Sequence, residues 1–160
     1  MLILSTGLCA QSYRSDIDNF EVALPEQLYP VTLRYEQNTP LGLAEVKNIS
    51  FHSSIGKFLV EIVDYPATDQ RSATQRIDAK INQLAQNPAL KLERVEHILS
   101  ETSPGAIINS FDGLRDQVHG IFVLGQREYH IRSESFTDES LELVLEQTET
   151  IAHSFKSVGL

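Results

Sequence analysis

Residues 57–65 constrain the fold of this chain more than any other segment. Successive side chains of an extended strand point to opposite faces, and this segment carries apolar side chains on both: Phe58, Val60 and Ile62 on one face, and Leu59, Val63 and Tyr65 on the other. A strand with two apolar faces is typical of the interior of a sheet whose two sides are both covered. We therefore expect an internal strand that ends before Pro66, with helices or long loops against each side of its sheet.

The strand pattern recurs along the chain. Apolar and polar residues alternate in ways that predict half-buried strands at 20–24 and 31–35, and further strands at 44–52 and 106–111. The clearest hairpin joins 118–124 to 127–133 around Gly125 and Gln126, with Leu124 opposite Arg127. Gly120 lies inside this hairpin, where a missing side chain often marks a bulge or a close backbone approach. Residues 89–100 fit either a helix begun by Pro88 or a strand, and the strand is the preferred interpretation.

Two segments follow the helical period instead. Apolar residues share one helical face within 72–86: Ala73, Ile77, Ile81, Leu84 and Ala85. A second helix is expected over 138–156, with Thr137 as its N-cap and acidic residues in its first turn. Together these patterns predict an α+β fold with a central antiparallel sheet of five to seven strands, in which 57–65 is internal, and with helices near 72–86 and 138–156.

Length, charge and cysteine content limit the functional classes. A chain of 160 residues is typical of one domain with an ordinary core. The formal net charge is −9, from 22 acidic residues against 13 Lys and Arg, and the basic residues form no stripe. Such a chain repels phosphate backbones, so we expect no nucleic-acid partner. Cys9 is the single cysteine, which excludes an intrachain disulfide, a CxxC redox pair and a cysteine-rich zinc site.

The first ten residues differ from the rest because they are apolar and uncharged. One interpretation is the end of a secretory signal that is cleaved after Ala10, although it has no basic segment; the other is an apolar arm that packs on the domain. We divide the chain into 1–15, a signal-peptide remnant or N-terminal arm, and 16–160, a single domain, and expect 1–12 to contribute little to the core. The expected location is extracytoplasmic (periplasm, envelope or thylakoid lumen), with the cytoplasm as the alternative. The apolar run is too short to span a bilayer, so we expect no transmembrane segment.

Motifs that carry catalysis are missing from the sequence, which contains no GxSxG, HExxH, P-loop or GxGxxG pattern. In the predicted hairpin His119 and His130 share a face at diagonal positions, roughly 7–8 Å apart, a separation that a zinc ion could close. Because no third ligand is visible by spacing, we predict no metal there and interpret them as two polar residues on a solvated or loop-covered face. Asp64, at the sheet margin, is interpreted as a turn cap or an acceptor of backbone N–H bonds. We assign no catalytic, cofactor-binding or metal-binding residue.

Short motifs in a fixed order resemble one family. They are Phe-Glu-Val-Ala-Leu-Pro at 20–25, Thr-Pro-Leu-Gly at 39–42, Asp-Tyr-Pro-Ala at 64–67, Ser-Pro-Gly at 103–105, the hairpin, and a C-terminal helix that ends in Ser-Phe-Lys at 154–156. This order resembles the PsbP-like superfamily, which includes extrinsic subunits and assembly factors of photosystem II and the Ran-binding import factor Mog. The resemblance implies an α/β/α sandwich around an antiparallel sheet, and binding rather than catalysis. It transfers no functional residue, and the metal sites of some members have no match here.

These observations predict a non-catalytic interaction or assembly module that binds a protein partner and is associated with a photosystem or an envelope. The alternatives are a carrier of a small ligand or lipid, with a pocket between sheet and helix, and an enzyme of unrecognised type. The acidic balance favours a partner with a basic patch. We expect partner contacts at Gly125–Glu128 and Asp112–Gln117, where charge reversal at Arg115 and Arg127 would weaken binding and leave the fold intact. The oligomeric state does not follow from the sequence.

Overall fold

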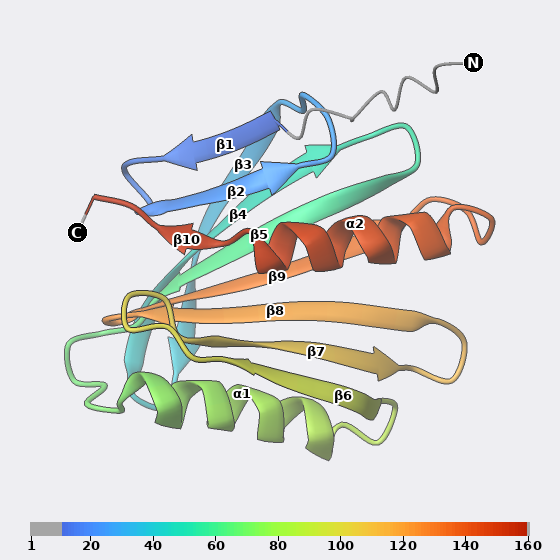
Figure 1. Ribbon diagram of the computed structural model, residues 1–160. Coiled ribbons are helices and arrows are strands. Elements are labelled where there is room, and N and C mark those ends of the chain that lie inside the picture. The colour runs from blue at the N-terminus through green and yellow to red at the C-terminus, as the bar shows by residue number, and fades with distance from the viewer. Residues whose placement is uncertain (1–10, 160) are drawn as a thin grey trace.

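The computed structural model describes residues 11–159 of the chain. In chain order the elements are β1 (Gln11–Ser15), β2 (Phe20–Leu24), β3 (Pro30–Thr39), β4 (Gly42–His52), β5 (Gly56–Asp64), α1 (Ala73–Gln86), β6 (Lys91–Ile98), β7 (Gly105–Phe111), β8 (Asp116–Leu124), β9 (Arg127–Ser135), α2 (Leu141–His153) and β10 (Lys156–Ser157). Strands β3 to β9 form a seven-stranded antiparallel sheet in the order β3-β4-β5-β9-β8-β7-β6, and β1, β2 and β10 form a three-stranded sheet (Figure 1). The predicted α+β class is confirmed, and so is the strand over most of 89–100.

Strand β5 is the internal strand that the apolar pattern predicts. It lies between β4 and β9 in the seven-stranded sheet. Phe58, Val60 and Ile62 are buried on one side of the sheet, and Val63 is buried on the other. A strand in this position has a hydrogen-bonding neighbour on each edge. The face with Phe58 is fully covered, whereas on the other face Val63 is buried and Leu59 is only half-buried.

Helix α1 covers part of one side of the seven-stranded sheet. It begins with a capping box: the Ser72 hydroxyl accepts a hydrogen bond from the backbone N–H of Gln75, and the Gln75 side chain accepts one from the backbone N–H of Ser72. Ile77 of α1 packs in a cluster with Ile121 and Val123 of β8 and with two buried residues of β7. The helix packs against β6, β7 and β8, and we call this side of the sheet the α1 side.

Helix α2 and the three-stranded sheet cover the opposite side, which we call the α2 side (Figure 1). The main core lies here, and Phe155, just beyond α2, is at its centre. The Phe155 ring stacks on Phe122 with ring centroids 4.2 Å apart and also contacts Phe20 and Tyr129. The buried Tyr129 hydroxyl donates a hydrogen bond to the carbonyl oxygen of Asp18, which ties the β1–β2 turn to the large sheet.

The glycine inside β8 marks a close approach between strand and helix. A Cβ atom placed on Gly120 would lie 2.9 Å from the Cβ of Ala152 in α2 and 3.4 Å from the Cβ of Ile131 in β9. The sequence is compatible with two interpretations of Gly120, a β-bulge or a close backbone approach. The β7–β8 and β8–β9 registers are continuous through Gly120, so its role is to let α2 pack closely.

The second helix is shorter than the pattern 138–156 indicates. It runs from Leu141 to His153, and the next residues turn back into β10, which pairs with β2. The prediction that Thr137 is its N-cap is wrong, because Ser140 occupies that position. Thr137 instead forms a hydrogen bond with the Ser140 side chain and accepts one from the Ser140 backbone N–H, which builds the turn that precedes the helix.

Residues 1–10 lie outside the described part of the chain, so the two interpretations of that segment stay predictions. Gln11–Ser15 forms β1 and pairs with β2. The ring of Tyr13 lies 4.8 Å from that of Phe51 and packs on the main core, whereas Gln11 and Ser12 are exposed. β1 thus packs with the domain, and the division of the chain into 1–15 and 16–160 stays a prediction. Among residues 11–159, neither helix combines the length and apolar character needed to cross a membrane.

Candidate functional site

The two hairpin histidines meet on the α1 side of the sheet. Leu124 pairs with Arg127, as predicted, and this register puts His119 and His130 at diagonal positions. They are buried rather than solvated, and Nδ1 of His119 lies within hydrogen-bonding distance, 2.9 Å, of Nε2 of His130. Burial lowers the pKa of His119 to about 4 and holds the pKa of His130 well below its usual value. The pair is therefore neutral near pH 7 and is arranged as a hydrogen-bonded element of the interior.

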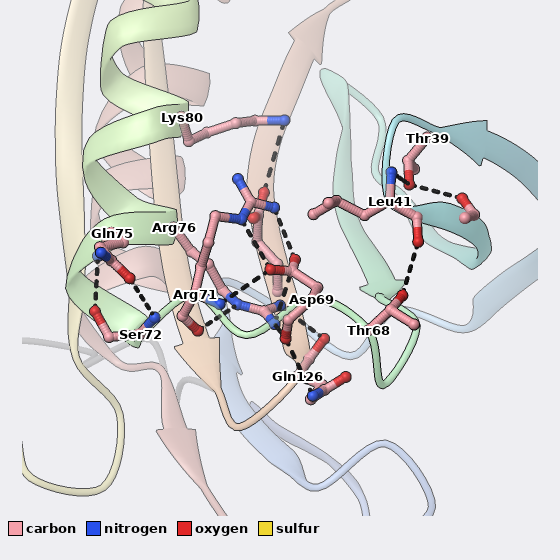
Figure 2. A network of polar contacts seen from close by, with 12 residues as sticks. Thr39, Leu41, Thr68, Asp69, Arg71, Ser72, Gln75, Arg76, Lys80 and Gln126 are labelled. Carbon is pink, nitrogen blue, oxygen red and sulfur yellow. Dashed lines mark hydrogen bonds and ion pairs between the residues drawn. The ribbon is translucent and has the colours of Figure 1, made fainter.

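A charged cluster lies at the N-terminal end of α1 (Figure 2). Asp69 is buried and accepts hydrogen bonds from Nε and Nη2 of Arg71 at 3.0 and 2.8 Å. Arg76, in the first turn of α1, is also buried and donates to the carbonyl oxygens of Asp69, Arg71 and Gln126. The bonds from Arg71 lower the pKa of Asp69 to about 2, against the opposing effect of burial.

Tyr65 and Glu128 extend this cluster along the sheet. The guanidinium carbons of Arg71 and Arg76 lie 5.4 and 5.0 Å from the centre of the Tyr65 ring, a distance typical of cation–π contacts. The buried carboxylate of Glu128 is 3.7 Å from Nζ of Lys80, and burial raises the pKa of Glu128. Because the carboxylates of Asp69 and Glu128 and the guanidinium of Arg76 are buried and paired, we interpret this cluster as a structural link between α1, β9 and the end of β5.

The hairpin tip at Gly125–Glu128, a predicted contact region, is largely engaged inside the molecule. The carbonyl oxygen of Gln126 accepts hydrogen bonds from the backbone N–H of Tyr65 and from Arg76. The Gln126 side chain in turn donates to the carbonyl oxygen of Asp69 at 3.2 Å. The tip is therefore bound to the loop between β5 and α1, while Gly125 and Gln126 are exposed, and partner contact at the tip stays a prediction.

Arg127 at the same tip is a structural residue. Its Nε and Nη2 form a bidentate pair with the Asp64 carboxylate, the second bond at 2.8 Å. Its Nη1 donates to the side chain of Asn19 and the carbonyl oxygen of Ile17, in the turn between β1 and β2. Asp64 is thus an ion-pair partner of Arg127, instead of the turn cap or acceptor of backbone N–H bonds that the sequence indicates. The expectation that charge reversal at Arg127 leaves the fold intact does not fit this geometry.

The second predicted contact region, Asp112–Gln117, is a surface turn. The Asp112 carboxylate accepts hydrogen bonds from the backbone N–H groups of Leu114 and Arg115 and from the Gln117 side chain. These backbone bonds lower the pKa of Asp112. Arg115 is exposed and pairs with Asp138 in the loop before α2. Unlike Arg127, Arg115 is joined to the molecule by one exposed ion pair.

One group of side chains has the spacing of metal ligands within residues 11–159. Glu96 of β6 and Glu149 and His153 of α2 place their ligand atoms within 4.8 Å of one another. Arg94 lies 3.0 Å from the carboxylate of Glu96 and 3.6 Å from that of Glu149. Because a guanidinium already lies between the two carboxylates, we interpret the group as an ion-pair network that joins β6 to α2. The absence of a bound metal from this protein stays a prediction.

A groove of about 450 Å³ lies on the α2 side, beside the β1–β2 turn. Its lining includes two ion pairs, Lys47 with Asp18 and Arg127 with Asp64. The remaining lining is mixed: Ile17, Arg34, Tyr35, Glu36, Glu45, Val46 and Ile62. Most of the lining residues are charged, and the groove lies away from the two helix–sheet interfaces, where the carrier alternative places its apolar pocket.

The most exposed apolar feature of the sheet lies on β3. Val31, Leu33 and Tyr35 expose 62%, 62% and 42% of their surface. They point to the α1 side, because the β3–β4 register places Tyr35 opposite Val46, a residue that packs against Val63 and Tyr65 on that side. Helix α1 packs on the other half of the sheet and leaves these three residues uncovered. We call Val31, Leu33 and Tyr35 the β3 strip.

No protein-family model matches this chain, and no curated protein matches it in sequence. Among solved structures, the solution structure of cyanobacterial PsbP (CyanoP) from Synechocystis sp. PCC 6803 is similar to it, with a TM-score of 0.55 over 98% of each chain. This chain has the PsbP fold. The two sequences are 17% identical, so the likeness lies in the arrangement of the backbone.

On this PsbP fold the internal polar clusters and the β3 strip make different contributions. The clusters around Asp69 and His130 are closed and paired, so they hold the elements in place. Within residues 11–159 the strip is exposed and lies on a long, regularly paired strand, which makes it the candidate functional surface. Sequence reasoning missed it because alternation of apolar and polar residues predicts one apolar face of a strand but does not indicate whether another element covers that face.

Proposed function

We propose that this protein is a non-catalytic module that binds a protein partner through the β3 strip and the adjoining surface of β4 and β5. The observation that carries the proposal is a row of three large apolar side chains, at alternate positions of one strand, on a part of the sheet that neither helix within residues 11–159 covers. Single exposed apolar residues are common on any protein, whereas a contiguous apolar surface is typical of a binding site.

The chemistry around the strip indicates what the partner presents. Glu61 of β5 lies on the α1 side in the same row as Leu33, with Asn48 between them. Within residues 11–159 the Glu61 carboxylate has no ion-pair partner. A partner surface that fits combines apolar side chains for the strip with a Lys or Arg for Glu61. The formal net charge of −9 favours the approach of such a basic surface.

Two further features favour binding over the alternatives. His119, His130 and Asp69 have strongly shifted pKa values, and all three are buried and paired inside the molecule, instead of converging in an open cleft as such groups do in enzymes. The groove beside the β1–β2 turn is open and most of its lining residues are charged, whereas a carrier of lipids needs an enclosed apolar cavity.

A matched pair of leucine variants tests the proposal. Leu33 belongs to the strip, whereas Leu43 of β4 is 50% exposed and points to the α2 side, opposite Asn38. Wild type, Leu33→Asp and Leu43→Asp, each with a photo-crosslinker on Ser50 beside the strip, are used to capture partners from cells of the native organism. We expect one crosslinked protein with wild type and Leu43→Asp, and its loss with Leu33→Asp. Equal crosslinking by all three variants would mean that the strip is not the binding surface.

We also propose that the protein acts outside the cytoplasm, in association with a photosystem or an envelope. The likeness to cyanobacterial PsbP and the apolar character of residues 1–10 support this location. Cell fractionation, followed by mass measurement of the protein's N-terminus, tests it. We expect the protein in the extracytoplasmic fraction with Gln11 as its first residue; an intact N-terminus in the cytoplasmic fraction contradicts the proposal.

A further inference from the structure

The seven-stranded sheet has two edges that differ in character. β6, at one edge, has eight residues, of which Lys91, Glu93, Arg94 and Glu96 are charged, and its pairing is interrupted between Leu92 and Arg94. Charges and irregular pairing are features that prevent an edge strand from pairing with another chain. β3, at the other edge, has ten residues, pairs with β4 without interruption and contains no lysine. Residues 30–38 are exposed throughout.

The hairpin between β3 and β4 determines which backbone groups of β3 are free. Thr39 and Gly42 are the closing pair of a two-residue turn, and such a pair exchanges both of its backbone hydrogen bonds. Because bonded positions alternate along a regular ladder, the odd-numbered residues of β3 bond to β4. The N–H and C=O groups of four even-numbered residues therefore point away from the sheet: Thr32, Arg34, Glu36 and Asn38.

We propose that this edge pairs with the same edge of a second copy of the chain, antiparallel and with Tyr35 on the two-fold axis. In this register Arg34 lies opposite Glu36 of the second copy, and Glu36 lies opposite its Arg34. Thr32 and Asn38 face each other in the same way, so each free N–H and C=O group of these four residues meets a partner. Within residues 11–159 neither Arg34 nor Glu36 has an ion-pair partner, which leaves both charges available.

Neighbouring registers are less favourable for identifiable reasons. An axis through residue 34 places the Arg34 residues of the two copies opposite each other, and an axis through residue 36 does the same with the two Glu36 residues. Like charges directly opposite each other are destabilising. An axis through Leu33 places Glu36 opposite Pro30, which has no N–H to donate. An axis through Gln37 places Arg34 opposite Pro40, with the same defect. The axis through Tyr35 avoids all of these pairings.

The geometry also limits the assembly to two copies. A two-fold axis through the β3 edges is perpendicular to the sheet, so the same side of each copy faces the same way and the two β3 strips meet at Tyr35. The outer edges of the joined sheet are then two copies of β6, which the charges and the interruption protect. The assembly is a closed dimer with one continuous sheet. This inference goes beyond the proposed partner binding, because it concerns the edge of β3 instead of its α1 face.

Charge exchange between positions 34 and 36 tests the dimer. The dimer contains two pairings between positions 34 and 36. In Arg34→Glu both pairings bring two glutamates together, and in Glu36→Arg both bring two arginines together. We expect each single variant to associate at least about tenfold more weakly than wild type in sedimentation-velocity experiments. An equimolar mixture of the two single variants restores opposite charges at both positions, and so does the double variant, so both form dimers. Glu93→Arg on β6 changes the net charge by the same amount as Glu36→Arg, and we expect it to leave the dimer intact.

The outcomes separate this inference from the proposed function. A wild-type protein that stays monomeric at high concentration overturns the dimer, and so does a dimer that both single variants retain. Arg34 and Glu36 point to the α2 side and leave the β3 strip unchanged, so a monomeric variant that still crosslinks a partner at the strip retains the proposed function without the dimer. Loss of crosslinking in Leu33→Asp supports the proposed function and does not affect the test of the dimer by charge exchange.

Discussion

Nδ1 of His119 lies 2.9 Å from Nε2 of His130, and the two buried rings share one hydrogen bond on the α1 side of the sheet. Lys80 and Arg132 are the positive groups near this pair, and both oppose its protonation. Protonation of both imidazoles would leave the shared bond without an acceptor nitrogen and place two positive charges side by side. The pair is therefore stable in the neutral form and sensitive to acid.

This relationship predicts a loss of stability in mild acid. The pKa of His119 is about 4 in the folded protein and 6.5 in the unfolded chain, so the unfolded chain binds the proton first as the pH falls. The contribution of His119 is complete above pH 6.5 and decreases as the pH falls toward 4, by about 3 kcal/mol in total. Urea unfolding at a series of pH values between 7 and about 4 measures it.

A variant without the imidazoles provides the control for this pH series. His119→Gln with His130→Asn keeps polar side chains at both positions and removes the titration, so its stability should change less over the same range. Glu128 acts in the opposite direction, because its raised pKa lets the folded protein keep a proton that the unfolded chain loses. Parallel pH profiles of the wild type and the double variant would contradict the assignment of acid sensitivity to the pair.

Much of the fold follows from local sequence. The register of the β8–β9 hairpin follows from the turn at Gly125 and Gln126, and the position of β5 follows from its two apolar faces. Both arise from contacts between neighbouring residues or from strand periodicity. The end of α2 was predicted less well, because the apolar pattern continues to Phe155 although the helix ends at His153. Phe155 belongs to the core through the turn into β10.

The candidate surface and the internal clusters could not be predicted in this way. Asp69, Arg76 and Gln126 are brought together by the packing of α1 on the hairpin tip, and no spacing along the chain indicates that contact. Arg127 appeared as an exposed tip residue because its partners, Asp64 and Asn19, lie far away in sequence. The exposure of Leu33 depends on where α1 packs, which is a property of the whole fold.

Charge reversal at the two predicted contact arginines should give different results. Arg127→Glu replaces a bidentate ion pair with two facing carboxylates, at Asp64 and at the new glutamate, and should reduce the free energy of unfolding by about 2 kcal/mol. Arg115→Glu disturbs one exposed ion pair with Asp138 and should change it by less than about 0.5 kcal/mol. Urea titration at neutral pH measures both, and equal stability of the two variants would contradict a structural role for Arg127.

Removal of single tyrosine hydroxyls should distinguish an internal bond from a surface one. Tyr129→Phe leaves the carbonyl oxygen of Asp18 without its buried donor and should cost about 1 to 2 kcal/mol. Tyr29 is 77% exposed, so Tyr29→Phe removes a hydroxyl whose bonding partners can bind water instead. The free energy of unfolding of this variant should stay within about 0.5 kcal/mol of the wild-type value. Thermal unfolding compares the pair, and a tolerant Tyr129→Phe would show that the bond to Asp18 contributes little.

The close approach of β8 and α2 should appear as coupling between two small residues. Gly120→Ala places a methyl group 2.9 Å from the Cβ of Ala152, nearer than two such atoms pack, and should destabilise the protein by about 1 to 3 kcal/mol. Ala152→Gly alone should cost about 1 kcal/mol through the helix propensity of glycine, with a further loss from its buried methyl group. In the double variant the alanine at position 120 occupies the space that the methyl group of Ala152 leaves. The loss of unfolding free energy in the double variant should therefore be smaller than the sum of the two single losses by about 1 kcal/mol. Urea unfolding of the wild type and the three variants measures it. Additive losses would show that the space at Gly120 is limited by Ile131 or Phe122 instead of α2.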